Sequence, residues 1–145
     1  MWFSASQIKN FYIENELREI TNYVKKFDLT YNPNEVLVTV GGSEAIDIAI
    51  RAVVETGDEV IIPTPSFVCY EPIVRLAGGV PVVINTRAEN DFKLTKEELI
   101  SAITPKTKLL MLCSPNNPTG SVYTLENLQA LVEVLKKHPH VNVLA

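Results

Sequence analysis

From about residue 35 to the end, the chain alternates short apolar runs rich in β-branched residues with longer segments of helical period. This alternation is typical of repeated βα units, which build a largely parallel sheet. Several runs are apolar at every position, as expected of strands covered by helices on both faces. We therefore predict an α/β fold with three α-β-α layers and a mostly parallel sheet. The predicted strands span residues 36–40, 59–62, 80–84, 108–113 and 141–145.

The helical segments carry residues that start and stop helices. Apolar residues at helical spacing follow Ser43, and Gly57 stands where a left-handed residue would end that helix. Thr95 and Glu98 form a T-x-x-E capping box, which predicts a second, short helix. Thr124 caps a third predicted helix with a continuous apolar stripe.

Length and pattern bound the domain organisation. A chain of 145 residues has room for one domain with a hydrophobic core. Residues 1–30 show an amphipathic helical pattern without a strand, so we predict an N-terminal helical segment there and one α/β domain over residues 31–145.

Composition excludes several classes of function. The formal charge of −4, without a basic stripe, argues against nucleic acid as a partner. No apolar run approaches the ~20 residues of a membrane-spanning helix, and the first residues lack the pattern of a secretory signal. We expect no membrane contact and a cytoplasmic location. Cys69 and Cys113 lack the spacing of a metal motif, so we expect reduced, buried thiols and no metal.

The first loop of chemical interest joins the predicted strand 36–40 to the helix that follows. It reads Val40-Gly41-Gly42-Ser43-Glu44. Glycines permit close backbone approach, and a helix N-terminus offers amides and a positive dipole to an anion, with the Ser43 hydroxyl as a further donor. Taken alone, the loop fits either a phosphate site or a plain strand-to-helix turn capped by Ser43.

Two further loops follow predicted strands, where ligands collect in open α/β sheets. Phe67 and Tyr70 come after the second predicted strand and offer aromatic faces to a flat ring, or else pack in the core. Asn117 lies in a proline-rich polar turn after the fourth predicted strand. Its side-chain amide could serve a ligand oxygen, or the segment could be a simple turn.

Together these segments resemble class I/II aminotransferases, the fold type I enzymes that use pyridoxal phosphate, and above all bacterial aminotransferase A and aspartate-type enzymes. The resemblance covers residues from about 31 to the end and rests on the runs VTVGGSEAIDIAIRA, GDEVIIPTPSFVCYEP, LAGGVPV and SPNNPTG. It implies transfer of an amino group between an amino acid and a 2-oxo acid, in a homo-oligomer.

The resemblance also implies roles for individual residues. Backbone amides and the hydroxyl of Gly42, Ser43 and Glu44 would hold the cofactor phosphate. Phe67 would stack on the pyridine ring, and Asn117 would hydrogen-bond the phenolic oxygen of the cofactor. Tyr70 would line the same pocket.

The catalytic lysine of the family has no counterpart among these residues. The resemblance places it, and the acid that keeps the pyridine nitrogen protonated, after the Asn117 loop. None of Lys106, Lys108, Lys136 or Lys137 stands in the matching context, so we assign no catalytic residue. We expect this chain alone to be inactive and to bind pyridoxal phosphate weakly and without a covalent bond.

Family topology implies that the strand 36–40 lies beside strands that this sequence does not contain. We therefore expect it to pair with residues 141–145 or with a second copy of the chain through strand exchange. Other hypotheses remain open at this point. They are a non-catalytic module that binds a phosphorylated ligand, an oligomerising structural unit, and a parent enzyme of another fold type I class, such as a lyase or decarboxylase.

Overall fold

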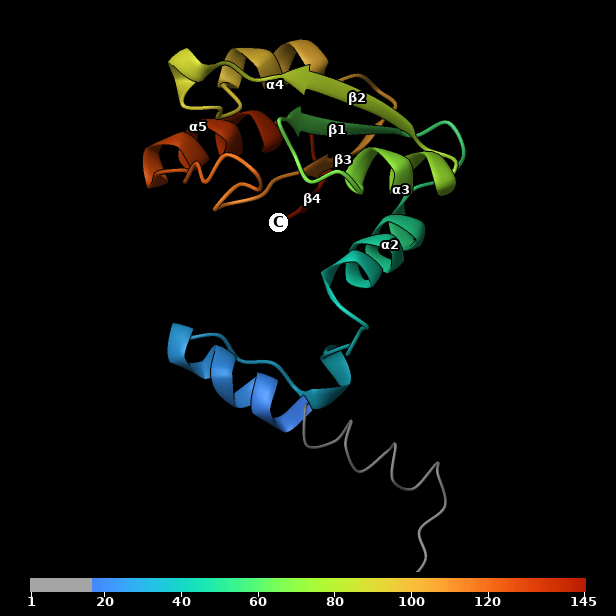
Figure 1. Cartoon of the computed structure of the whole chain (residues 1–145), viewed down its shortest axis with the longest axis vertical. Coiled ribbons are helices and arrows are strands. Elements are labelled where there is room, and N and C mark those ends of the chain that lie inside the picture. Colours follow the sequence, from blue (N-terminus) through green and yellow to red (C-terminus); the bar gives the residue numbers. More distant parts are fainter. Residues whose placement is uncertain (1–16) are drawn as a thin grey trace, which may run out of the picture. The chain divides into compact units, whose positions relative to one another are not determined.

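The structure is a computed structural model that describes residues 17–145 (Figure 1). The chain divides into two compact units between Gly42 and Ser43. In the first unit, residues 17–24 are helical, and the 3-10 turns η1 (Lys25–Phe27) and η2 (Pro33–Glu35) follow. The N-terminal part of the predicted helical segment, residues 1–16, lies outside the described residues. The domain division predicted at residue 31 stays a prediction.

The rest of the chain forms the α/β fold that the sequence predicts. The helices are α2 (Gly42–Val53), α3 (Tyr70–Leu76), α4 (Lys96–Ala102) and α5 (Leu125–Leu135), with the 3-10 turn η3 (Ala88–Asn90). The strands are β1 (Glu59–Thr64), β2 (Val80–Asn85), β3 (Thr107–Met111) and β4 (Asn142–Leu144). Among residues 17–145, no helix combines the length and apolar character needed to cross a bilayer.

All strand pairs of the sheet are parallel, in the order β2-β1-β3-β4 (Figure 1). β1 pairs with β2 over its whole length, from Glu59 to Thr64. Its pairing with β3 ends earlier, where Ile61 stands opposite Leu110. The predicted strands 59–62, 80–84, 108–113 and 141–145 are thus confirmed, with ends shifted by one or two residues.

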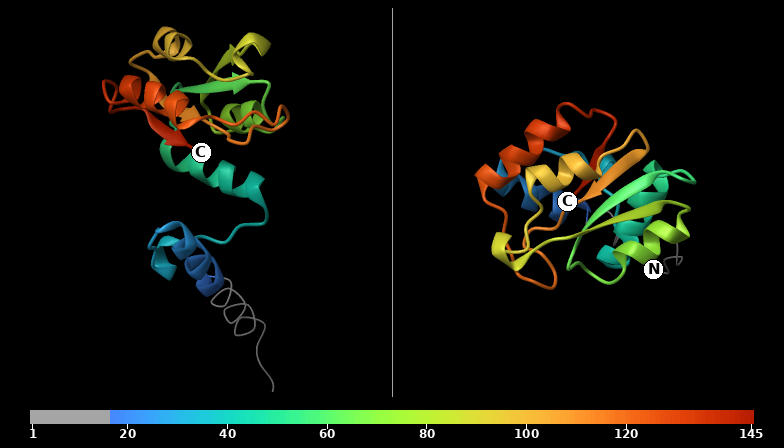
Figure 2. Two further views of the ribbon diagram at one scale, coloured as in Figure 1. Left: turned by 90° about the vertical axis from the view of Figure 1, so that its left-hand side faces the viewer. Right: turned by 90° about the horizontal axis from the view of Figure 1, so that it is seen from above.

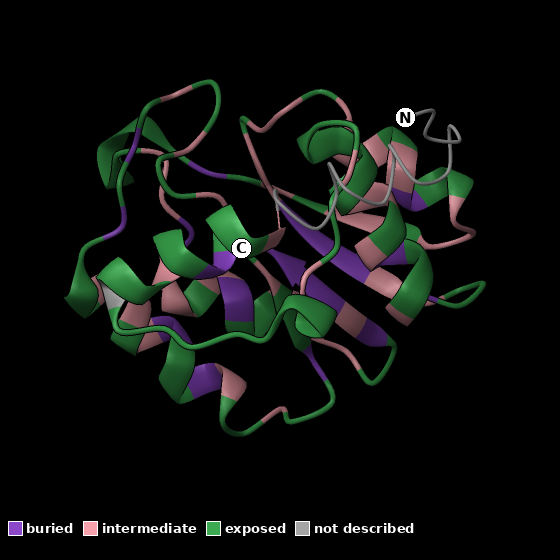
Figure 3. Ribbon diagram, turned by 90° about the horizontal axis from the view of Figure 1, so that it is seen from below, coloured by how far each residue is buried: buried purple, intermediate pink, exposed green. Residues whose placement is uncertain are grey.

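Alternate residues of the inner strands point to opposite faces of the sheet, and helices cover both faces (Figures 2 and 3). On one face, Ile61 and Leu110 pack in the α4–α5 cluster. This cluster contains Ile61, Leu94, Leu99, Leu110, Tyr123, Leu131, Val134 and Val141. On the other face, Val60 and Met111 pack in the α2–α3 cluster. This cluster contains Ile50, Val54, Val60, Ile62, Val74, Leu109 and Met111. The three layers are therefore confirmed.

Capping fixes where α4 and α5 begin. The Thr95 hydroxyl accepts a hydrogen bond from the Glu98 amide at 3.2 Å, and the Glu98 carboxylate accepts one from the Thr95 amide at 2.9 Å. Thr124 accepts in the same way from the Asn127 amide at 3.2 Å. Each bond satisfies a helix-start amide that has no intrahelical partner. Both predicted caps are confirmed.

The prediction of a strand over residues 36–40 is wrong for this chain. These residues form no strand, and Leu37 is 66% exposed. The predicted pairing with residues 141–145 is not formed either: the sheet of the described residues ends with β4, which pairs with β3, and residues 36–40 belong to no ladder. A β-branched run shows only that a segment suits a pleated, half-buried surface. Residues 36–40 lie in the first compact unit, whereas all four strands lie in the second. Pairing with a second copy stays a prediction.

The sequence analysis did not predict helix α3, because it placed Phe67 and Tyr70 in a loop after the second predicted strand. β1 in fact continues through Thr64, and α3 begins at Tyr70. Pro72 hides the helical pattern, yet proline is tolerated in the first turn, where the amide has no intrahelical acceptor. An ion pair between Glu71 and Arg75 at 2.7 Å spans one turn of this short helix.

Replacement of Leu110 by alanine tests the core. Leu110 lies in β3 and is fully buried in the α4–α5 cluster, so Leu110→Ala should lower the free energy of unfolding by about 3 kcal/mol. Leu125→Ala is the matched control, because Leu125 is 72% exposed at the start of α5. Urea denaturation followed by circular dichroism measures both. Equal effects of the two substitutions would contradict this assignment of the core.

Candidate functional site

The carboxyl ends of β1, β2 and β3 lie at one edge of the sheet because the strands are parallel. The segments that leave this edge are residues 65–69 after β1, residues 86–95 after β2 and residues 112–124 after β3. Two of the three loops that the sequence analysis selected are among them. Ligands of open α/β sheets bind at such edges, outside the carboxyl ends of the strands.

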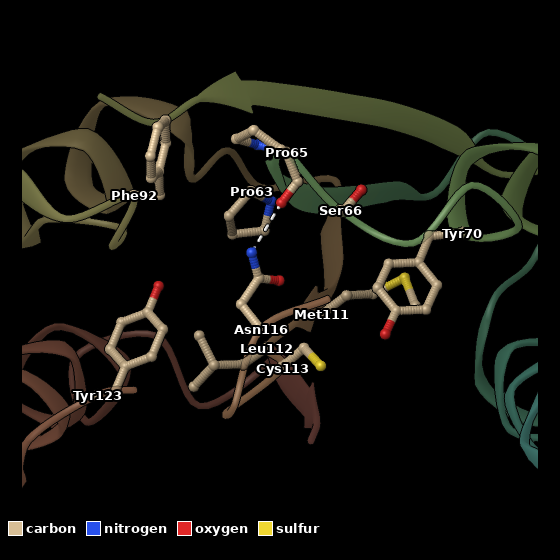
Figure 4. A pocket seen from close by; sticks show the side chains of 10 residues that line it. All are labelled: Pro63, Pro65, Ser66, Tyr70, Phe92, Met111, Leu112, Cys113, Asn116 and Tyr123. Atoms are coloured by element: carbon tan, nitrogen blue, oxygen red, sulfur yellow. Dashed lines mark hydrogen bonds between the residues drawn. The ribbon is translucent and has the colours of Figure 1, made fainter. Parts of the chain in front are cut away.

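Asn116 joins the segment after β3 to the segment after β1. Its side-chain amide donates to the Pro65 carbonyl at 2.9 Å and to the Thr119 hydroxyl at 2.8 Å (Figure 4). Its main chain exchanges hydrogen bonds within its own turn. The Asn116 amide donates to the Ser121 carbonyl, and the Gly120 amide donates to the Asn116 carbonyl, each at 2.8 Å. Main-chain hydrogen bonds therefore close this turn, and the Asn116 side chain links it to the segment after β1.

The segment after β2 is fastened to the same edge. The amide and hydroxyl of Thr86 donate to the Thr64 carbonyl at 2.8 and 2.7 Å. Farther along, the hydroxyl of Tyr123 accepts a hydrogen bond from the Leu94 amide at 2.7 Å. Burial is the main cause that raises the pKa of Tyr123. Hydrogen bonds therefore connect all three segments at the carboxyl edge.

A small pocket opens between these segments (Figure 4). Its lining residues are Pro63, Pro65, Ser66, Tyr70, Phe92, Met111, Leu112, Cys113, Asn116 and Tyr123. The cavity measures about 10 Å³, the space of roughly one water molecule. Sites that enclose a small molecule are commonly ~300 Å³ or larger. The cavity is therefore too small to enclose such a molecule.

Tyr70 and Cys113 line this pocket, and Cys69 directly precedes Tyr70 in the sequence. Burial, followed by interaction with Cys113 and Cys69, raises the pKa of Tyr70 to about 12. Like that of any tyrosine, its hydroxyl is protonated at neutral pH and can donate a hydrogen bond. Both cysteines are free and half-buried, and the Cys113 thiol donates to the Pro115 carbonyl at 3.2 Å. The sequence analysis predicted buried thiols, whereas both cysteines are only half-buried.

The predicted aromatic and amide residues lie beside the pocket. The half-buried ring of Phe67 packs edge to face on Tyr70, with centroids 5.9 Å apart and planes at 78°. Tyr70 itself lines the pocket. Asn117 is exposed and lies next to Asn116 in the same turn. The structure thus brings the surroundings of Phe67, Tyr70 and Asn117 to one edge.

The predicted phosphate loop lies at the start of α2. Gly41 has a φ of +81°, a conformation that favours glycine, and its amide donates to the Thr39 carbonyl at 3.0 Å. Gly42, Ser43 and Glu44 are exposed in the first helical turn, and a Cβ built on Gly42 would meet nothing within 4 Å. None of these residues lines the pocket at the carboxyl edge.

Sequence reasoning missed several pocket residues. Ser66 and Asn116 stand directly before the predicted site residues Phe67 and Asn117, and that adjacency was the available signal. Phe92 and Tyr123 enter from more distant segments. The folded path of the chain brings them to the pocket, and no local pattern in the sequence marks them.

Comparison with known proteins gives a consistent result. The sequence model of the family "Aminotransferase class I and II" matches residues 4–145. The chain is 54% identical over 122 residues to the putative aminotransferase YugH of Bacillus subtilis, a match that covers 83% of the chain and 32% of that protein. It is 49% identical over 119 residues to the aspartate aminotransferase of Geobacillus stearothermophilus, covering 79% of the chain and 30% of that enzyme.

Solved structures agree with the fold. The aspartate aminotransferase of Rhizobium meliloti matches with a TM-score of 0.83 at 39% identity, over 88% of this chain and 32% of that one. An aromatic aminotransferase of Pyrococcus horikoshii matches with a TM-score of 0.82 at 40% identity, over 88% of this chain and 35% of that one. The chain thus spans about a third of the length of the relatives that it matches.

The raised pKa of Tyr70 gives a test of the pocket. The neutral hydroxyl is favoured in the folded state, so its contribution to stability is complete below the ordinary pKa of 10.0 and is lost as pH rises toward about 12. In an ultraviolet titration of tyrosine ionisation, Tyr70→Phe should remove a component that titrates near pH 12.

Tyr31→Phe serves as the control, because Tyr31 is an exposed tyrosine outside this cluster. It should leave the late component in place. If Tyr70→Phe removes no late component, the hydroxyl is not held by burial and by the two cysteines as the structure describes.

Proposed function

We propose, because the chain belongs to the family of class I and II aminotransferases, that it forms part of the cofactor-binding domain of an aminotransferase. The parent reaction moves an amino group between an amino acid and a 2-oxo acid. Relatives named as aspartate and as aspartate/prephenate aminotransferases support this class of reaction. A homo-oligomeric parent, as the family resemblance implies, is part of the proposal.

The observation that carries the proposal is the junction at the carboxyl edge of the sheet. The Asn116 amide reaches the Pro65 carbonyl at 2.9 Å, which brings together the segments that hold Phe67 and Asn117. An aromatic face and an amide donor are the groups that a flat, oxygen-bearing ring requires. Tyr70 lines the pocket and adds a half-buried hydroxyl that can donate a hydrogen bond.

Pyridoxal phosphate fits these residues in chemistry. The first amides of α2, with the Ser43 hydroxyl, suit a phosphate, and among the described residues a Cβ built on Gly42 would meet nothing within 4 Å. Phe67 and Asn117 suit the ring and its oxygen. The enclosed volume of about 10 Å³ is far too small for the ring, so these residues would form one wall of its site. The chain spans about a third of the length of its relatives.

Each residue has a defined task in this proposal. Gly42, Ser43 and Glu44 would bind the phosphate and so fix the distance of the ring from the sheet. Phe67 would cover one ring face and exclude water from it, and Asn117 would donate to the ring oxygen. Pyridoxal phosphate, when bound, supplies an electron sink for the bonds at the α-carbon of an amino acid.

We assign no catalytic residue within this sequence. Transamination requires a lysine that attaches the cofactor and moves a proton, and no lysine among these 145 residues stands in the family context. The isolated 145-residue chain is therefore proposed to hold pyridoxal phosphate reversibly, and to lack transaminase activity.

Replacement of Phe67 tests the cofactor wall. Loss of an aromatic contact should weaken binding of pyridoxal phosphate to Phe67→Leu by roughly 2- to 10-fold. Equilibrium dialysis of cofactor and chain measures this. Val68→Ala is the matched control, because Val68 is 83% exposed on the same loop, and it should bind as the unaltered chain does. Saturable binding of inorganic phosphate without binding of pyridoxal phosphate would instead favour a phosphate-binding module.

Activity gives a separate test. The purified chain, mixed with pyridoxal phosphate, aspartate and 2-oxoglutarate, should form no glutamate above the rate that free cofactor supports. Coupled detection of oxaloacetate measures the reaction. Turnover on the order of 1 s⁻¹, the lower end of ordinary enzyme rates, would overturn the assignment of this chain as inactive alone.

A further inference from the structure

The ladder between β1 and β3 does not reach the carboxyl edge. Its last paired residues are Ile61 and Leu110, whereas β1 continues to Thr64 beside β2. The main-chain hydrogen bonds of this ladder therefore do not join the segments that follow β1 and β3. Another interaction must set their spacing.

The Asn116 side chain supplies that interaction. It is half-buried and lines the pocket, and its amide nitrogen lies 2.9 Å from the Pro65 oxygen and 2.8 Å from the Thr119 hydroxyl. Among the side-chain hydrogen bonds of residues 17–145, this is the one that joins the segment 65–69 to the turn 114–120. One amide group thus ties two loops.

We propose that Asn116 is the positioning residue of the cofactor site. It holds the loop of Phe67 and the turn of Asn117 at the separation that a flat ring between them requires. The inference rests on the proposed function, because it assigns the tie to cofactor binding. Asn116 itself has both amide hydrogens engaged within the protein, so it acts on the ligand through its neighbours.

The tie to Pro65 demands a donor at position 116, because a carbonyl oxygen can only accept. Both partners of Asn116 are used as acceptors, the Pro65 carbonyl and the Thr119 hydroxyl. The side-chain NH₂ of asparagine provides two hydrogens in fixed directions. A carboxylate of the same shape offers none, and would place its negative charge against a carbonyl oxygen. Asn116→Asp therefore removes the tie with almost no change in volume.

The test compares Asn116→Asp with Asn117→Asp, the same chemical change one residue later on an exposed side chain. Hydrogen exchange of the cofactor-free 145-residue chain, followed by nuclear magnetic resonance, reports on the turn through the amides of Gly120 and Ser121. Asn116→Asp should speed this exchange roughly tenfold, as expected for loss of a hydrogen bond, and Asn117→Asp should not.

Ligand binding then separates positioning from general loss of structure. Asn116→Asp should weaken binding of pyridoxal phosphate roughly tenfold, while affinity for inorganic phosphate, assigned to the start of α2, stays unchanged. Asn117→Asp should weaken pyridoxal phosphate binding without loosening the turn. If Asn116→Asp does not fold, Asn116→Ala removes the same donors without adding charge, and the same measurements apply.

Three results would overturn the proposal. Unchanged exchange in both Asn116 variants would show that the side chain does not hold the turn. A parallel fall in affinity for phosphate and for pyridoxal phosphate would show a structural role alone. If the unaltered chain binds no pyridoxal phosphate while Asn116→Asp still loosens the turn, the proposed function fails and the tie serves the fold only.

Discussion

Burial of β1 on both faces is the constraint on which the structure depends. Val60, Ile61 and Ile62 are almost completely inaccessible to solvent, and they alternate between the two core clusters. A strand in this position needs helices above and below it and a neighbouring strand on each side. β2 and β3 occupy the two sides. The layers, the strand order and the direction in which the loops leave the sheet all follow from this arrangement.

That central strand also explains why chemically useful residues converge. β1 delivers its following loop to the same edge as β3, and the two loops carry an aromatic pair and an asparagine pair. Hydrogen bonds from side chains to main-chain carbonyls, such as Asn116 to Pro65 and Thr86 to Thr64, replace the ladder where it ends. Order at this edge therefore depends on a few polar side chains, whereas order in the sheet depends on apolar packing.

The sequence predicts those parts of the fold that local rules decide. Apolar strands and capping boxes can be recognised from residues that are close together in the sequence. For this reason β1 to β4 and the starts of α4 and α5 could be predicted. Residues 36–40 show the limit, because a strand requires a neighbour and composition does not reveal whether one exists. For the site, the polar turn pointed to Asn117 but not to Asn116, whose importance depends on the Pro65 carbonyl, 51 residues away in sequence. The pocket residues Phe92 and Tyr123 likewise depend on long-range packing.

The protonation of Tyr70 has a consequence for how ligand binding should vary with acidity. Because burial and the two cysteines raise the pKa of Tyr70 to about 12, this phenol stays protonated farther into the alkaline range than an ordinary tyrosine. Any proton exchange that accompanies binding near neutrality must therefore come from the ligand or from other groups. Between acid and neutral pH, Tyr70 therefore keeps its proton and remains a hydrogen-bond donor at this edge.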